Sequence, residues 1–126
     1  MALMTERTAV FHGMHPWGVE SEIIYCEQTA LGEIDLHNAA DFLGVSEADG
    51  GKEITLQFEA IELKRRFNIR FGGIRKAEII SCTEFHRDDK KLFYAFNSLG
   101  DGVFEFEAAI VSGTLEAEMV TFEVAG

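Results

Sequence analysis

The sequence of residues 53–71 is EITLQFEAIELKRRFNIRF, and its apolar residues occupy every second position. They lie first on even positions, from Ile54 to Ala60, and after one shift of phase on odd positions, from Ile61 to Phe71. Alternation of this kind is typical of a β-strand with one buried face. We interpret the shift between Ala60 and Ile61 as a β-bulge, or as a corner where a long strand passes from one sheet to another.

A cationic segment overlaps this stretch in a chain that is otherwise acidic. Residues 64–76 hold six basic residues and no acidic residue, although the net charge of the chain is −11. An acidic excess repels nucleic acid and anionic membranes at long range and attracts basic partners. We therefore expect neither nucleic acid nor a membrane as the partner of this protein.

The length of 126 residues suits a single domain over residues 1–126, with a core that needs no disulfide. The two cysteines, Cys26 and Cys82, each follow an apolar run. This placement is typical of buried thiols in a reducing compartment, and a disulfide between two core strands is the alternative. The first residues show no pattern of a signal peptide or of a membrane span. These features predict a cytoplasmic protein.

One segment has a helical pattern instead of a strand pattern. Asp35 can cap a helix, and Gly44 can end it in the left-handed conformation. Four apolar residues between them share one helical face: Leu36, Ala39, Ala40 and Leu43. The sequence therefore predicts a short helix over residues 36–43.

A second shift of phase occurs near the C-terminus. Leu115, Ala117 and Met119 share one face of an expected strand, and the apolar face then moves to Val120 and Phe122. Two such bulges or corners favour a curved, closed or sandwich-like sheet. The fold class predicted is mainly β, an antiparallel β-barrel or β-sandwich of about eight or nine strands with the one helix over residues 36–43.

The glycines at positions 72 and 73 predict a tight turn, and the strand after it is expected to form a hairpin with the strand before it. The outer face of that hairpin would carry a platform that binds phosphate or carboxylate groups. Its members would be Lys64, Arg66, Arg70 and Lys76. The alternative is an ordinary face on which acidic neighbours such as Glu59 and Glu78 balance these charges.

Arg65 is a separate case, because the odd register places it between Leu63 and Phe67 on the face expected to be inside. A buried guanidinium needs a partner. That partner would be the carboxylate of an apolar ligand in a barrel interior, or else an internal glutamate or solvent at the rim.

The histidines offer a third set of candidate residues. His12, His15 and Trp17 lie close together in the sequence, and they could line a ligand pocket. Cys82 and His86 are four residues apart, which on a strand is nearly 14 Å and too far to share a metal ion. No third ligand has a supporting spacing, so we predict no metal site. No sequence motif indicates a cofactor or a catalytic nucleophile, and we lean against an enzyme.

Three functions from different classes are compatible with these patterns. The leading hypothesis is a noncatalytic interaction protein whose acidic face docks on a basic protein partner. Four residues of the last strands would form this face: Glu105, Glu107, Glu116 and Glu118. The alternative is a carrier or sensor of a small apolar ligand with Arg65 as its anchor, and the third is an enzyme of unknown class. Edge strands could also join two copies into a homodimer.

Overall fold

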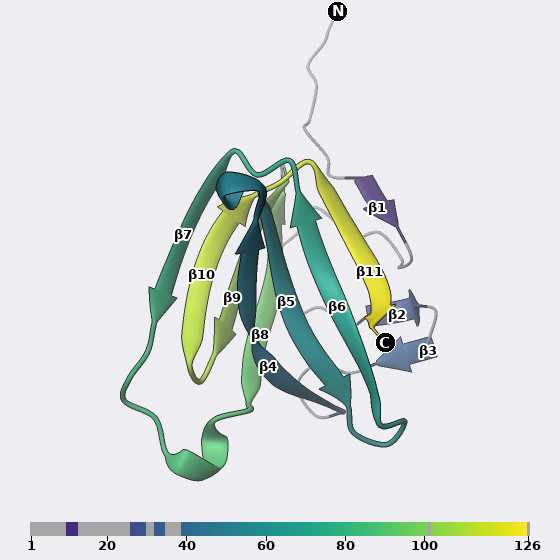
Figure 1. The fold of residues 1–126 in the computed structure, drawn as a ribbon, viewed down its shortest axis with the longest axis vertical. Coiled ribbons are helices and arrows are strands. Elements are labelled where there is room, and N and C mark those ends of the chain that lie inside the picture. Colours follow the sequence, from purple (N-terminus) through teal and green to yellow (C-terminus); the bar gives the residue numbers. More distant parts are fainter. Residues whose placement is uncertain (1–9, 13–25, 30–31, 35–38, 101, 126) are drawn as a thin grey trace, which may run out of the picture.

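The computed structural model describes residues 10–12, 26–29, 32–34, 39–100 and 102–125, and it is an antiparallel β-sandwich (Figure 1). One sheet has the order β1-β11-β6-β5-β4. Its strands are β1 (Val10–His12), β11 (Met119–Ala125), β6 (Arg65–Gly72), β5 (Glu53–Ala60) and β4 (Ala40–Ala48). The facing sheet has the order β7-β10-β9-β8. Its strands are β7 (Lys76–Ser81), β10 (Val111–Glu116), β9 (Val103–Ala108) and β8 (Phe93–Gly100).

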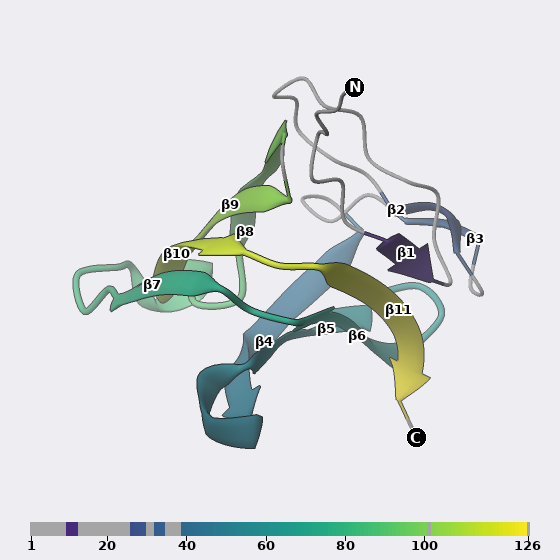
Figure 2. The ribbon, with the colours of Figure 1, turned by 90° about the horizontal axis from the view of Figure 1, so that it is seen from above.

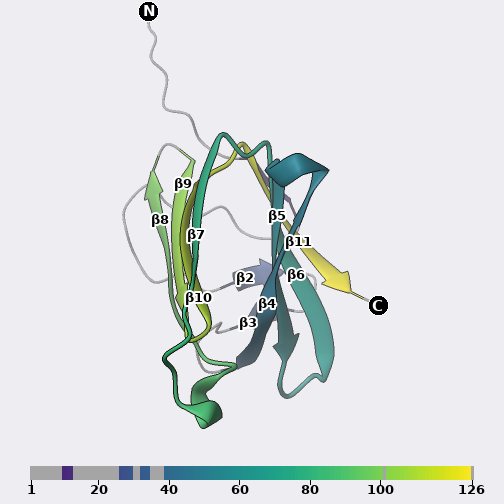
Figure 3. The same cartoon turned by 60° about the vertical axis from the view of Figure 1, so that its left-hand side comes forward.

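The smaller elements complete the described part of the chain. β2 (Cys26–Thr29) and β3 (Gly32–Ile34) form a two-stranded sheet, and two short 3-10 turns, η1 (Asp49–Gly51) and η2 (Arg87–Asp89), lie in connections. The strands β4 to β11 make two four-stranded antiparallel sheets. β1 extends one of these sheets by pairing in parallel with β11. The mainly β, antiparallel fold class is thus confirmed, and the sheets form a sandwich and do not close into a barrel (Figure 3).

The alternation that began the sequence analysis correctly identifies the inner faces of β5 and β6. Ile54, Leu56 and Phe58 of β5 are buried, and so are Phe67 and Ile69 of β6. The shift of phase between them, however, is neither a bulge nor a corner. It is a hairpin turn over residues 61–64, after which the chain runs back antiparallel beside β5. A period of two cannot distinguish these cases, because each strand of a hairpin has its own phase.

The second shift of phase is a corner, which was one of the two alternatives predicted for it. The chain leaves β10 in one sheet and enters β11 in the other, with Ala117 buried and Glu118 exposed between them. The turn after β6 likewise carries the chain from one sheet to the other, where β7 begins. This connection and the one from β10 to β11 run side by side (Figure 2). The expected hairpin of β6 with β7 is therefore wrong, because β7 pairs with β10 while β6 pairs with β5 and β11.

The predicted helix over residues 36–43 is also wrong. Residues 35–38 lie outside the described part of the chain, and Ala40 begins the strand β4. Ala40 and Phe42 alternate with the partly exposed Asp41, so the pattern of period two prevails over the helical one. Phe42 packs against Phe58 of β5 and Phe93 of β8, with ring centroids 5.4 Å apart in both cases. This burial against both sheets outweighs the weak helical preference of a short segment.

Phenylalanine rings fill much of the space between the sheets. Phe58 meets Phe93 at 5.1 Å, and Phe71 meets Phe104 at 5.3 Å, so that rings of the two sheets touch. Such aromatic pairs contribute about 0.5–1.5 kcal/mol each beyond the area that they bury. No helix among the described residues is long and apolar enough to cross a membrane.

Candidate functional site

The outer face of the β7–β10–β9–β8 sheet carries six side chains in two parallel rungs. In the first rung Glu78 of β7, Thr114 of β10 and Glu105 of β9 are cross-strand neighbours. The second rung has the same order of strands and consists of Ile80, Ser112 and Glu107. We call these six residues the acidic grid. Carboxylates occupy three of its corners, Ile80 occupies the fourth, and two hydroxyl groups lie between them.

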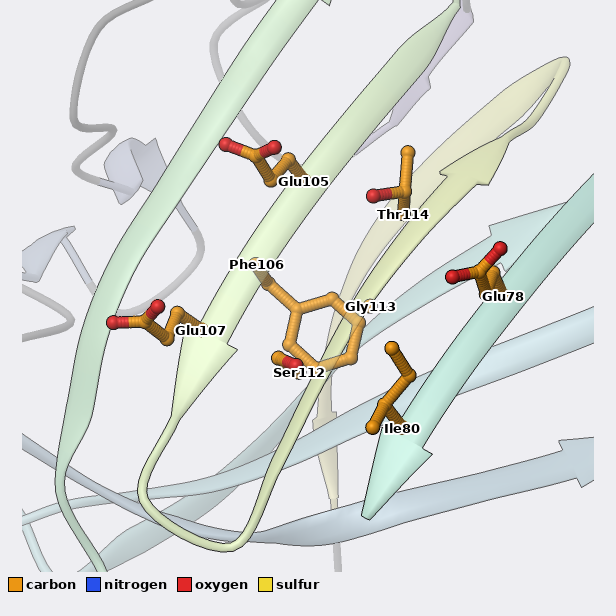
Figure 4. Close-up of a pocket in the computed structure, with 8 residues that line it drawn as sticks. All are labelled: Glu78, Ile80, Glu105, Phe106, Glu107, Ser112, Gly113 and Thr114. Carbon is orange, nitrogen blue, oxygen red and sulfur yellow. The ribbon is translucent and has the colours of Figure 1, made fainter. Parts of the chain in front are cut away.

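The acidic grid surrounds a hollow of about 360 Å³ that is open to solvent (Figure 4). Among the described residues, its lining consists of the six residues of the grid together with Phe106 and Gly113, none of which is basic. A neighbouring hollow of about 550 Å³ shares Glu78 and Thr114 and extends toward Lys76 and Glu116 at the end of the sheet. The carboxylates thus border a concave surface and are not scattered over a flat one.

Gly113 determines how tightly the sheet packs beneath the grid. It lies between Ser112 and Thr114 on β10 and faces the core, where it is paired with Phe106. A Cβ atom at this position would lie 2.7 Å from Ile79 and 2.8 Å from the Phe106 ring. Only glycine lets these two side chains close over the strand. The bare backbone of β10 is therefore part of the floor of the hollow.

The geometry of the grid spaces its charges regularly. Glu105 and Glu107 are two residues apart on one strand, which corresponds to about 7 Å. Glu78 and Glu105 flank Thr114 from either side, at two strand spacings or about 10 Å. Glu78, Glu105 and Glu107 are all exposed. No group of three or more His, Cys, Asp or Glu side chains within the described ranges is placed to hold a metal ion. The three carboxylates of the grid are thus separated from one another by about 7–10 Å or more.

The structure divides the four glutamates predicted for partner binding into two pairs. Glu105 and Glu107 belong to the grid. Glu116 and Glu118 lie instead at the corner between β10 and β11, where both contact Arg75. The Arg75 Nε atom is 3.1 Å from a Glu116 oxygen and Nη1 is 3.3 Å from a Glu118 oxygen. The second pair therefore has an evident role in holding the crossing from β6 to β7 against the crossing from β10 to β11.

The four basic residues predicted as an anion platform do not lie on one hairpin. Lys64 lies in the turn before β6, Arg66 and Arg70 lie on the outer face of β6, and Lys76 begins β7 in the other sheet. Arg70 lies between two carboxylates, 3.7 Å from Glu53 and 3.8 Å from Glu123. The alternative of a face balanced by acidic neighbours describes this arrangement better.

Arg65 is not buried, because it lies at the exposed end of β6. It is the first residue of β6, pairs with Ala60 across the hairpin, and is exposed. Arg65 keeps the phase of the buried Phe67, but the turn over residues 61–64 directly before it places it at the end of the sheet. The alternative of a position at the rim, open to solvent, fits this arrangement. Ile61 and Leu63, which shared the expected inner face, are 48% and 52% exposed in this turn. The apolar carrier stays a prediction, without the anchor on which it was based.

The histidine set is described only in part. His15 and Trp17 lie outside the described residues, and His12 ends β1, where it is the backbone partner of Thr121. His86 precedes η2, and its Nδ1 atom accepts a hydrogen bond of 3.2 Å from the backbone N–H of Asp88. Its evident role is to cap this turn.

Sequence reasoning identified only two of the six residues of the grid. Alternation identified Glu105 and Glu107 as outward residues of one strand, but Glu78 had been assigned to a hairpin with β6. Only the pairing of β10 with both β7 and β9 brings Glu78, Thr114 and Glu105 into one rung. The pattern Ser-Gly-Thr at positions 112–114, with two outward hydroxyls and an inward glycine, is the one local signal that was available.

Comparison of the chain with protein-family models, with curated proteins and with solved structures found no match.

Proposed function

We propose that this protein is a noncatalytic interaction module whose acidic grid binds a basic segment of a protein partner. The observation that supports this most directly is the concave lining of the grid, whose described residues include three carboxylates and no basic residue. A surface of one charge sign attracts and orients a partner of the opposite sign, and a hollow adds shape to that attraction.

The spacing of the grid favours an extended basic segment. Alternate side chains of an extended chain repeat at about 7 Å, which matches the separation of Glu105 and Glu107 on β9. Lysine or arginine side chains with this repeat would each reach one carboxylate. The hydroxyl oxygens of Ser112 and Thr114 can accept hydrogen bonds from further N–H groups of the segment. Ile80 offers an apolar contact to the methylene groups of a basic side chain.

A synthetic peptide of alternating lysine and serine tests this proposal. We expect it to bind the wild type, and the triple variant E78Q/E105Q/E107Q should raise the Kd at least about tenfold, which corresponds to about 1.4 kcal/mol. Binding should also weaken steeply with added salt, because exposed charges are screened. Isothermal titration calorimetry measures both effects.

A matched control separates the grid from net charge alone. The triple variant E47Q/D49N/E62Q removes the same number of exposed charges away from the grid. It should change the Kd less than about threefold, because screening limits charges at longer distances. Equal weakening by the two triple variants would show attraction to net charge only, and an unchanged affinity in the grid variant would contradict the proposal directly.

A further inference from the structure

The edges of the two sheets are protected unequally. Among the described strands, β8 carries two irregularities in its pairing and β4 carries one, while β1 has only three residues. β7 is an edge strand of six residues whose pairing with β10 is regular throughout, and it contains no proline. Bulges, proline, short length and charged side chains are usual means by which proteins prevent edge-to-edge pairing. β7 lies at the edge of its sheet (Figure 1) and lacks the first three, and its charged residues are Lys76 and Glu78.

The hydrogen-bonding pattern shows which backbone groups of β7 face away from β10. The backbone N–H of Cys82 donates to the carbonyl of Ile110 at 2.8 Å, which makes Cys82 a hydrogen-bonded partner of Ile110. In an antiparallel ladder such partners recur at every second residue, so Ile80 and Glu78 also direct their N–H and C=O groups to β10. The groups of Ala77, Ile79 and Ser81 therefore point outward.

We propose that β7 pairs antiparallel with β7 of a second copy of this chain, with the two-fold axis passing beside Ile80. Ile79 of each copy then exchanges two backbone hydrogen bonds with Ser81 of the other, or about four in total. Ile80 faces Ile80 of the second copy on the outer surface. Ile80 is 53% exposed in the single chain, although its neighbours on that face are polar. The contact gives this isolated apolar side chain a partner.

Charge selects this register over its neighbours. A two-fold axis at Glu78 would place two glutamates directly opposite each other, which is destabilising. An axis at Ile79 would make the two Glu78 residues diagonal cross-strand neighbours, about 7–8 Å apart, where they would still repel each other. With the axis at Ile80, the two Glu78 residues are about 14 Å apart along the strands. If the pairing continues two residues beyond Cys82, Lys76 of each copy lies opposite Glu84 of the other copy. The dimer then has two such pairs of opposite charge.

The consequence is one continuous sheet of eight strands through both copies. The outer faces of the two four-stranded sheets would form a single surface, and the dimer would present two acidic grids on it. This pairing depends on backbone groups at the edge and on Ile80, Lys76 and Glu84. It does not depend on whether the grid binds a basic segment, so the two proposals can fail separately.

Sedimentation equilibrium over a range of protein concentrations tests the dimer. We expect the wild type to form a reversible dimer and I80K to raise the dissociation constant at least about tenfold, because it replaces the apolar pair with two facing cations. The control L63K introduces the same charge at an equally exposed apolar residue in the β5–β6 turn, and it should dimerise like the wild type. A wild type that stays monomeric at the highest soluble concentration, or an I80K variant that dimerises normally, overturns the proposal.

Cysteine cross-linking tests the register. In a chain with Cys26 and Cys82 replaced by serine, I80C should form a disulfide-linked dimer on mild oxidation. Facing residues of a non-hydrogen-bonded pair have Cα atoms about 4.5 Å apart, which a disulfide can span. E78C, on the same face of the same strand, should remain uncross-linked. Cross-linking of E78C in place of I80C would overturn this register.

Charge exchange provides a second test of the register. K76E and E84K should each weaken the dimer, whereas the double variant K76E/E84K should restore the wild-type dissociation constant within about twofold. If the loss of dimerisation free energy in the double variant equals the sum of the losses in the two single variants, Lys76 and Glu84 do not face each other and the register is wrong.

Discussion

The two outer faces of this sandwich differ in how their basic and acidic side chains are arranged. On the face of β4, β5, β6 and β11, cations lie among carboxylates, as shown by Arg70 between Glu53 and Glu123. On the face of β7, β10, β9 and β8, the basic residues Arg75 and Lys76 lie near one end, and the residues described around the acidic grid include no basic one. Both faces are polar and belong to similar sheets. Under the proposed function, the position of the cations, more than the number of carboxylates, would decide which face binds a basic partner.

Packing beneath the two faces differs as well, and this gives the largest expected effect. G113A should lower the free energy of unfolding by about 1–3 kcal/mol, because its Cβ would overlap Ile79 and the Phe106 ring. The matched substitution in the other sheet is G72A, whose Cβ would meet only the flexible Met119 side chain at 3.5 Å or more. It should change the free energy of unfolding by less than about 1 kcal/mol. Denaturant unfolding of both variants measures this comparison, and equal losses would show that the sheet under the grid is not especially tight.

A smaller effect is expected at the boundary between the faces. R75Q removes the ion pairs of Arg75 with Glu116 and Glu118, in which Arg75 is 29% and Glu118 is 62% exposed. Partly exposed pairs of this kind contribute only about 0.2–1 kcal/mol each, so we expect a loss of about 0.5–1 kcal/mol at low salt. The loss should shrink in high salt, because screening already weakens these pairs in the wild type. A loss that is independent of salt would mean that Arg75 acts through packing and not through its charge.

The sequence predicted which side of a strand is buried more reliably than which strands lie next to each other. Alternation correctly identified the buried residues of β5 and β6, because burial on one side of a strand is a local property of the chain. It could not distinguish a bulge from the turn over residues 61–64, so it did not show that Arg65 lies at the exposed end of a strand. Around Ala40 the helical and extended patterns overlap, and contacts of Phe42 with distant rings decide between them.

The acidic grid could be predicted only in part for the same reason. Glu105 and Glu107 are two residues apart, so their common face follows from local geometry. Glu78 joins them only because the chain crosses between sheets at Gly73, whose φ of 64° is favourable for glycine. This crossing makes β7 a neighbour of β10 and not of β6. Strand order is set by long-range packing, which a local pattern does not record.

The most direct measurement of the central claim places a cation inside the grid. Thr114 lies between Glu78 and Glu105 on an exposed face, so T114K should fold normally and should imitate the balanced arrangement around Arg70. The control S46K adds the same charge at an exposed residue of β4. We predict that T114K raises the Kd for the alternating lysine–serine peptide at least about tenfold, whereas S46K raises it less than about threefold. Equal affinities of the wild type, T114K and S46K for this peptide would contradict the account.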